Sequence, residues 1–285
     1  MAASPLDIFR TKKRDRQRLA MISLYDAPSA RLCCDHDVDA LLVGDSLGNI
    51  ILGYDNTIPV TLVDMVRHTA AVVRGVKQSS CPAVPVIADL PFGSFHGDAD
   101  TIIANGAALM QVGASGVKLE GAGTAALKAI DLLVQMGAPV MGHLGYTPQS
   151  ALTFEKVVHD KTAPVAQRLL SEAKRLQQAG CFAIVLEVVR IELAARITDE
   201  LKIPTIGIGS GPHCDGQVLI WHELAGLIPS SYRFVKRYAE AHSLLAQAAG
   251  DYVAEVHRGT FPTREHGWSM PEQEIEISQR SEDEQ

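Results

Sequence analysis

The residues of this chain that could carry chemistry stand at the ends of short apolar runs. Each run has the composition of a buried β-strand, and most end in an acidic, basic or hydroxyl side chain. The group comprises Asp26, Asp45, Ser46, Asp89, Lys118, Glu120, His143, Glu187 and Ser210. In a barrel of parallel strands, the carboxyl ends of all strands meet at one mouth, where catalytic groups lie. We therefore interpret these side chains as candidates for one shared site.

The carboxylates of this group indicate a metal site. Asp45, Asp89 and Glu120 belong to three different runs, and carboxylates that converge in one barrel mouth repel one another unless a cation neutralises them. Two or three Asp or Glu oxygens with open water positions suit Mg²⁺ and leave room for a substrate's oxygens. The five cysteines have no CxxC spacing and do not cluster with histidines as zinc ligands do. We expect Asp45, Asp89 and Glu120 to bind Mg²⁺.

Three of these residues also have a structural interpretation. Asp45, within VGDSLG, could cap a following helix or turn. Asp89 precedes Leu90-Pro91 and could start a turn. His143, within MGHLG, could be a hydrogen-bonded core histidine. Each structural interpretation explains a single residue. None explains why several charged groups converge at one end of the barrel, and this convergence favours a functional site.

Charged residues inside two other runs need partners. Lys118 and Glu120 are two residues apart, so on a strand they share a face, and an ion pair between them is the structural alternative. Glu187 lies in the apolar run FAIVLEVV, where a buried carboxylate must be paired, protonated or bound to a cation. The segment GIGSG (207–211) could approach an anion through backbone N–H groups, or could simply be a tight turn.

The elements that position these residues alternate along the chain. Amphipathic stretches at 61–75 and 165–180 have helical spacing, and the second ends at a glycine in the C′ position. Residues after about 232 have the pattern of long helices that finish the domain. The apolar runs predict parallel strands at 19–26, 40–46, 84–91, 116–121, 139–145, 183–188, 204–210 and, more weakly, 216–221. Because no GxGxxG follows the first run, we favour a (β/α)8 barrel over a doubly wound sheet.

Composition limits the classes of protein to consider. The 285 residues carry a formal net charge of -7, which argues against a nucleic-acid partner. Residues 271–285 hold six acidic side chains and one arginine, a charge of -5, so the rest of the chain is close to neutral. No apolar run approaches the roughly 18 residues of a membrane span, and the basic start has no apolar signal segment behind it. We expect a cytoplasmic protein with a 1–18 N-terminal extension, a 19–266 barrel with C-terminal helices, and an acidic disordered tail at 267–285.

Eight motifs, in order and spacing, resemble those of the ketopantoate hydroxymethyltransferase family. The resemblance runs from about Leu19 to about His266. It implies a (β/α)8 TIM barrel of the phosphoenolpyruvate/pyruvate-domain type. The motifs are VGDSLG (43–48), HTAAVVRG (68–75), ADLPFGS (88–94), VKLEG (117–121), GHLGYTPQS (142–150), VLEVV (185–189), IPTIGIGSG (203–211) and DGQVLIWHELAG (215–226).

The resemblance also implies a reaction and roles for residues. The family transfers a hydroxymethyl group from methylenetetrahydrofolate to 3-methyl-2-oxobutanoate, giving 2-dehydropantoate in pantothenate biosynthesis, with Mg²⁺ as cofactor. By matching motif positions, Glu187 is the general base and His143 lies near the substrate. The remaining matched positions bind Mg²⁺ (Asp45, Asp89, Glu120) or the 2-oxo acid (Asp45, Ser46, Asp89, Lys118), and Lys118 also counts as catalytic. The family implies a homo-oligomer, commonly a decamer, with no membrane or nucleic-acid partner.

One segment departs from the family pattern. SALTFEKVVHDKTAP (150–164) stands where the family has a glycine-rich, basic segment. A paralogue that hydroxymethylates a different 2-oxo acid is therefore an alternative, and so is a non-catalytic barrel that acts as a binding partner. A lyase of the phosphoenolpyruvate mutase and isocitrate lyase kind would carry a cysteine-bearing catalytic loop, which this sequence lacks.

Overall fold

A computed structural model describes residues 4, 6–153, 162–229 and 232–271. Within these residues, eight strands close into a barrel in chain order, and every neighbouring pair is parallel. The strands are β1 (Leu19–Ser23), β2 (Ala40–Val43), β3 (Val86–Asp89), β4 (Gly116–Glu120), β5 (Val140–Gly145), β6 (Ala183–Glu187), β7 (Thr205–Ile208) and β8 (Gly216–Ile220). All eight lie within the predicted runs, so the (β/α)8 prediction is confirmed and the doubly wound sheet is excluded.

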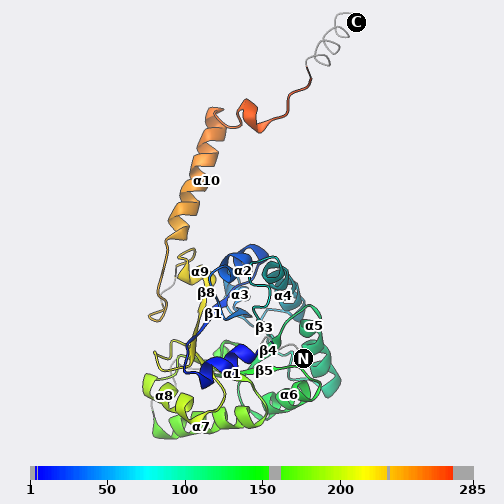
Figure 1. Cartoon of the computed structure of the whole chain (residues 1–285), viewed down its shortest axis with the longest axis vertical. Coiled ribbons are helices and arrows are strands. Elements are labelled where there is room, and N and C mark those ends of the chain that lie inside the picture. Colours follow the sequence, from blue (N-terminus) through cyan, green and yellow to red (C-terminus); the bar gives the residue numbers. More distant parts are fainter. Residues whose placement is uncertain (1–3, 5, 154–161, 230–231, 272–285) are drawn as a thin grey trace, which may run out of the picture.

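Helices surround most of the barrel (Figure 1). They are α1 (Asp7–Arg14), α2 (Ala27–Cys34), α3 (Leu47–Ile50), α4 (Leu62–Lys77), α5 (Ala99–Gln111), α6 (Thr124–Gln135), α7 (Ala163–Gln178), α8 (Ile191–Glu200), α9 (Trp221–Leu224) and α10 (Ala241–Arg258), with 3-10 turns η1 (Pro148–Thr153) and η2 (Arg264–His266). The prediction for 61–75 corresponds to α4, which begins at a capping box between Thr61 and Asp64. The prediction for 165–180 corresponds to α7, and Gly180 adopts the expected positive φ of 100°. None of the helices in the described part is both long and apolar enough to cross a bilayer.

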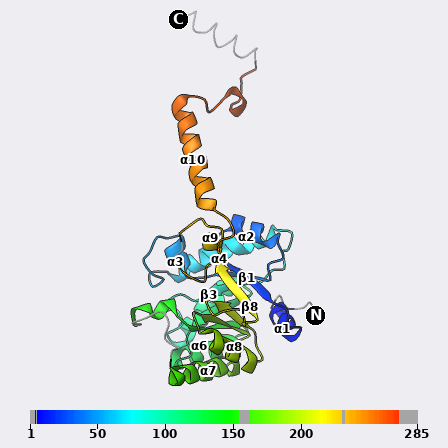
Figure 2. The same ribbon diagram turned by 90° about the vertical axis from the view of Figure 1, so that its left-hand side faces the viewer.

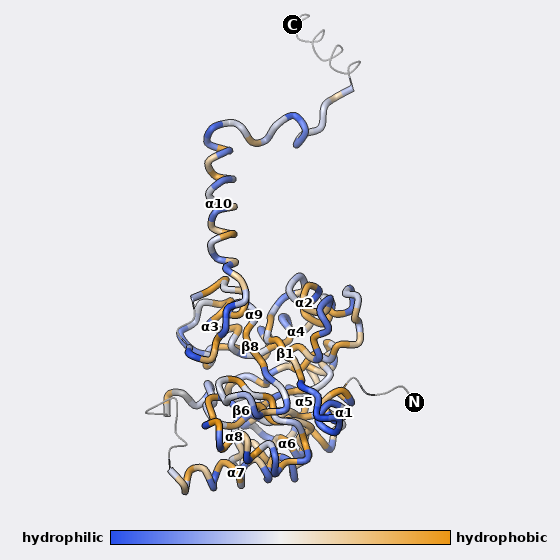
Figure 3. The backbone as a smooth tube through the Cα atoms, turned by 60° about the vertical axis from the view of Figure 1, so that its left-hand side comes forward, coloured by the Kyte–Doolittle hydropathy of each residue, from blue (hydrophilic) through white to orange (hydrophobic). Residues whose placement is uncertain are grey.

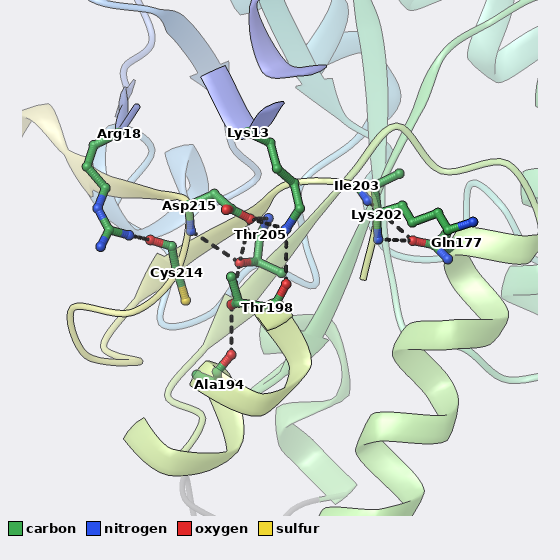
Figure 4. A network of polar contacts seen from close by, with 10 residues as sticks. All are labelled: Lys13, Arg18, Gln177, Ala194, Thr198, Lys202, Ile203, Thr205, Cys214 and Asp215. Atoms are coloured by element: carbon green, nitrogen blue, oxygen red, sulfur yellow. Dashed lines mark hydrogen bonds and ion pairs between the residues drawn. The ribbon is translucent and has the colours of Figure 1, made fainter. Parts of the chain in front are cut away.

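Helix α1, which lies within the predicted N-terminal extension, packs against the barrel. Phe9 of α1 is 1% exposed and packs among the side chains that fill the barrel interior, edge-on to Phe182 at a centroid distance of 5.2 Å. Figure 4 shows Lys13 donating to Oδ2 of Asp215 at 2.8 Å and to the carbonyl of Thr198 at 3.0 Å. Helix α1 is thus held to the end of the barrel opposite the strand carboxyl ends.

The C-terminal segment differs from the expectation. Helix α10 lies apart from the barrel (Figures 1 and 2) and buries none of its residues. The prediction of a long helix is confirmed, but this helix does not complete the barrel. Figure 3 shows apolar positions spaced along its length. Of the predicted acidic tail, residues 267–271 are in neither helix nor strand, and 272–285 lie outside the described residues.

Candidate active site

The register of neighbouring strands brings the predicted site residues together in pairs. Asp89 at the end of β3 is the partner of Lys118 on β4, and Glu120 at the end of β4 is the partner of His143 on β5. Glu187 ends β6, next to β5. The four residues of the first two pairs are each at most 6% exposed. The carboxyl end of the barrel therefore buries several charged groups in contact with one another, as the sequence predicts.

Lys118 pairs with Asp89 and not with its strand neighbour Glu120. Its Nζ lies 2.7 Å from Oδ2 of Asp89. Adjacent parallel strands are about 4.8 Å apart, closer than residues two apart on one strand, so the cross-strand partner is nearer. Burial by itself lowers the pKa of Lys118, but Asp89, Asp45 and Glu120 outweigh it and raise that pKa. Lys118 is therefore a permanent cation in the barrel mouth.

Asp45 is part of the same cluster and does not cap a helix. Its backbone N–H donates to Oδ2 of Asp89 at 3.1 Å, while its own Oδ2 accepts from Nε2 of Gln149 at 2.8 Å. Helix α3 has Ser46 at its N-cap, without a side-chain capping bond. Burial, followed by the charges of Asp89 and Glu120, raises the pKa of Asp45 well above its usual value. Lys118 and the hydrogen bond from Gln149 therefore do not fully compensate the burial of Asp45 and the repulsion from the carboxylates beside it.

His143 lies between two carboxylates. Its Nδ1 is 3.4 Å from Oε1 of Glu120, and its Nε2 is 3.2 Å from Oε2 of Glu187. Neither ring nitrogen reaches hydrogen-bond geometry, so these contacts are electrostatic. Burial lowers the pKa of His143, but the two carboxylates more than compensate and bring it to about 9. His143 is therefore buried like a core histidine yet charged at neutral pH, and it connects Glu187 to the rest of the cluster.

Glu187 occupies the most open position in the cluster, with its side chain 18% exposed. The next residue, Val188, has a φ of 53°, which a β-branched side chain rarely adopts. Hydrogen bonds hold this backbone: the Val188 N–H donates to the carbonyl of Ile208, and the Tyr146 N–H donates to the carbonyl of Glu187, both at 2.8 Å. Such strain persists only where surrounding structure imposes it, commonly at functional sites.

Ser46 is joined to a residue that sequence reasoning missed. The hydroxyls of Ser46 and Tyr25 are 2.8 Å apart, and Tyr25 is 1% exposed. The ring of His222 stacks on Tyr25 at a centroid distance of 5.6 Å. Burial raises the pKa of the Tyr25 phenol, which therefore stays protonated. Tyr25 immediately precedes Asp26 at the end of the first apolar run. The strand-end rule, by which polar side chains at the ends of apolar runs are candidate site residues, could therefore have found it.

Two predicted strand-end residues have structural roles. Asp26 caps α2, its Oδ1 accepting from the Ser29 N–H at 2.8 Å. The Ser210 hydroxyl donates to the carbonyl of Leu186 at 2.7 Å and accepts from the Val189 N–H at 3.0 Å, which ties β7 to β6. In GIGSG, Gly209 and Gly211 have φ of 68° and 77°, as the tight-turn alternative requires.

The carboxylates predicted to bind Mg²⁺ differ in how far their oxygens are already hydrogen-bonded. Across the described ranges, no group of three or more His, Cys, Asp and Glu residues is placed to hold a metal ion. Oε2 of Glu120 already accepts from the backbone N–H of Gln149 at 3.0 Å. Oδ1 of Asp89, in contrast, is buried and has no hydrogen-bond partner in the described part of the chain. Asp45 and Asp89 could supply two oxygens, with water and substrate completing the coordination that Mg²⁺ prefers.

Comparison with known proteins decides the family. The family model for ketopantoate hydroxymethyltransferase matches residues 5–264. This chain belongs to the ketopantoate hydroxymethyltransferase family. It is 45% identical over 260 residues to the 3-methyl-2-oxobutanoate hydroxymethyltransferase of Thermotoga maritima, covering 90% of this chain and 94% of that protein. With the enzyme of the same name from Carboxydothermus hydrogenoformans, the identity is 48% over 268 residues, covering 93% and 95%. As a family member, the chain is an enzyme of the hydroxymethyltransferase class.

Solved structures share the fold at much lower identity. The barrel superposes on 2,3-dimethylmalate lyase, a phosphoenolpyruvate mutase/isocitrate lyase superfamily member, with a TM-score of 0.60 and 15% identity, covering 100% of this chain and 99% of that one. Phosphoenolpyruvate phosphomutase from Streptomyces platensis gives a TM-score of 0.58 at 12% identity, covering 98% and 96%. These likenesses confirm the predicted barrel fold, while the family follows from the relatives of higher sequence identity.

Proposed function

We propose that this enzyme transfers a hydroxymethyl group from methylenetetrahydrofolate to 3-methyl-2-oxobutanoate, giving 2-dehydropantoate. The names of relatives at 45% and 48% identity support the reaction. The observation in the molecule that carries the proposal is the buried ion pair of Lys118 and Asp89 beside Asp45. Charged groups that are costly to bury are retained where they bind or transform a polar ligand.

The 2-oxo acid would be bound by groups from three strand ends. Its carboxylate and ketone oxygens would meet Lys118, whose charge persists in the buried site. Ser46, held by Tyr25, would donate to the carboxylate. Mg²⁺, bound by Asp45 and Asp89, would polarise the ketone oxygen and stabilise negative charge that develops there. Lys118, which is buried, would add a second positive charge next to the same oxygen.

Glu187 is the proposed general base. Its position at the open edge of the cluster lets it reach a substrate carbon while His143 contacts its Oε2. The contact with Nε2 of His143 would orient the carboxylate toward the substrate. Removal of the β-proton leaves an enolate. Water would add to the methylene carbon of the folate, and cleavage of its C–N bonds would release tetrahydrofolate and leave a formaldehyde carbonyl. The enolate carbon would attack this carbonyl carbon, and protonation of the resulting alkoxide would give the hydroxymethyl group.

The test is product formation from 3-methyl-2-oxobutanoate and methylenetetrahydrofolate, with and without a chelator. The proposal expects turnover that chelator abolishes and Mg²⁺ restores. Turnover that is insensitive to chelator would remove the cation from the mechanism. A panel of other 2-oxo acids in the same assay identifies a paralogue with a different acceptor. A protein that binds neither Mg²⁺ nor any 2-oxo acid by calorimetry would instead be the non-catalytic barrel.

We also propose that the enzyme is a homo-oligomer in which α10 packs against another copy. The helix exposes Leu244, Leu245, Tyr252, Val253 and Val256, each at least 42% accessible. Side-chain burial alternates along β1 and β8, and β8 is followed directly only by the four-residue α9, so this side of the barrel is incompletely covered. An apolar helix and an open barrel side on one chain complement each other between copies.

A further inference from the structure

Gln149 occupies the point where the chain crosses the barrel mouth after β5. It lies in η1, four residues beyond the end of the strand, and is 5% exposed. A glutamine so deeply buried must satisfy its amide within the protein or with a ligand. Sequence patterns do not point to Gln149, since it lies in a loop and bears no charge.

The contacts of Gln149 join three strand ends. Its Nε2 donates to Oδ2 of Asp45 at 2.8 Å and to the carbonyl of Leu90 at 3.0 Å. Its backbone N–H donates to Oε2 of Glu120 at 3.0 Å. One residue thus holds a carboxylate that follows β2, a carbonyl that follows β3 and a carboxylate at the end of β4.

The partners fix which way the amide faces. Asp45 Oδ2 and the Leu90 carbonyl are both acceptors, so only the NH₂ side of the amide can face them. The carbonyl oxygen Oε1 then faces the other way and is buried without a hydrogen-bond partner among the residues that the structure describes. A glutamate here would place a further carboxylate against Asp45, and a shorter amide would not reach both acceptors. The position therefore requires the donors and the length of glutamine.

We propose that Gln149 is a positioning residue that holds the carboxylate of Asp45 in the orientation needed to bind a divalent cation. This inference rests on the proposed function, which places a cation between Asp45 and Asp89. Residues that hydrogen-bond to metal ligands orient them, and their loss typically costs 10- to 100-fold in affinity. The side chain of Gln149 acts on Asp45, whereas its main chain acts on Glu120, so a side-chain substitution isolates the first effect.

The test compares Gln149→Met with a matched control in the full chain. Methionine has a similar length and no N–H donors. The control is Gln217→Met on β8, where an exposed glutamine donates to the carbonyl of Gly211 at 2.9 Å, away from the cluster. The measurements are Mn²⁺ affinity by electron paramagnetic resonance, which needs no turnover, and the Tm of the metal-free protein.

We expect Gln149→Met to weaken Mn²⁺ binding at least about 10-fold with little change in metal-free Tm, and Gln217→Met to bind as the wild type does. Wild-type affinity in Gln149→Met would overturn the inference. If that variant does not fold, Gln149→Asn decides in the same way, and failure of both to fold would assign Gln149 a purely structural role. A wild-type protein that binds no Mn²⁺ would instead count against the proposed cation site itself.

Discussion

Nζ of Lys118 lies 2.7 Å from Oδ2 of Asp89, and the two side chains are only 5% and 3% exposed. The pair joins β3 to β4 across the register of the barrel. Removing one partner of a buried ion pair leaves the other charge uncompensated, which is far more costly than losing a surface pair. Because Asp89 also accepts from the backbone of Asp45, the pair helps to fix the position of Asp45 as well.

Lys118→Met should therefore destabilise the protein strongly. We expect the free energy of unfolding to fall by about 3–5 kcal/mol, measured by urea denaturation of the metal-free protein. Lys174→Met, which breaks an exposed pair with Glu200 on the outer surface, should cost no more than about 1 kcal/mol. Equal losses in the two variants would contradict the assignment of Lys118 as the principal counter-ion of the cluster.

His143 should titrate near pH 9 in the metal-free protein. Its pKa rises from 6.5 to about 9 because Glu120 and Glu187 favour the charged ring despite its burial. The folded protein binds this proton more tightly than the unfolded chain, so the stabilisation is complete below about pH 6.5 and is lost as pH rises through about 9. Nitrogen NMR of the ring measures the midpoint directly. In His143→Gln, unfolding free energy should depend less on pH across this window, and a midpoint near 6.5 would rule out the paired imidazolium.

Much of the barrel could be predicted because parallel strands covered on both faces are continuously apolar, and polar residues mark their ends. The strand-end rule correctly brought together Asp45, Asp89, Lys118 and His143. Asp26 and Ser210 also follow strands, but Asp26 caps a helix and Ser210 ties two strands together, so structural and catalytic polar groups share these positions.

Contacts between elements were harder to predict. The spacing along one strand suggests Glu120 as the ion-pair partner of Lys118. The actual partner, Asp89, follows from the register between two strands, which a sequence does not show. Gln149 was missed because its bond to Asp45 spans 104 residues and depends on the course of a short turn. For α10 the helical pattern was clear, but an apolar stripe does not reveal which surface covers it.

Glu187→Gln should separate proton removal from cation binding. Glutamine keeps the size of the side chain but cannot accept the proton, so exchange of the substrate's β-proton with solvent deuterium should stop. Cation affinity should stay close to wild type, because Glu187 contacts His143 rather than Asp45 or Asp89. Proton NMR of 3-methyl-2-oxobutanoate in deuterated buffer follows the exchange without any folate. Exchange at the wild-type rate would show that another group is the base.

Charges placed on the apolar stripe of α10 should disrupt assembly while the barrel stays folded. Leu245 and Val256 lie on one side of the helix, where neither is buried within the chain. Leu245→Asp with Val256→Asp should therefore lower the mass in sedimentation velocity while leaving the Tm of the barrel nearly unchanged. Ser243→Asp with Gln247→Asp adds the same charge to the opposite face and should leave the mass as in the wild type. An unchanged mass in the first variant would exclude this stripe as the contact between copies.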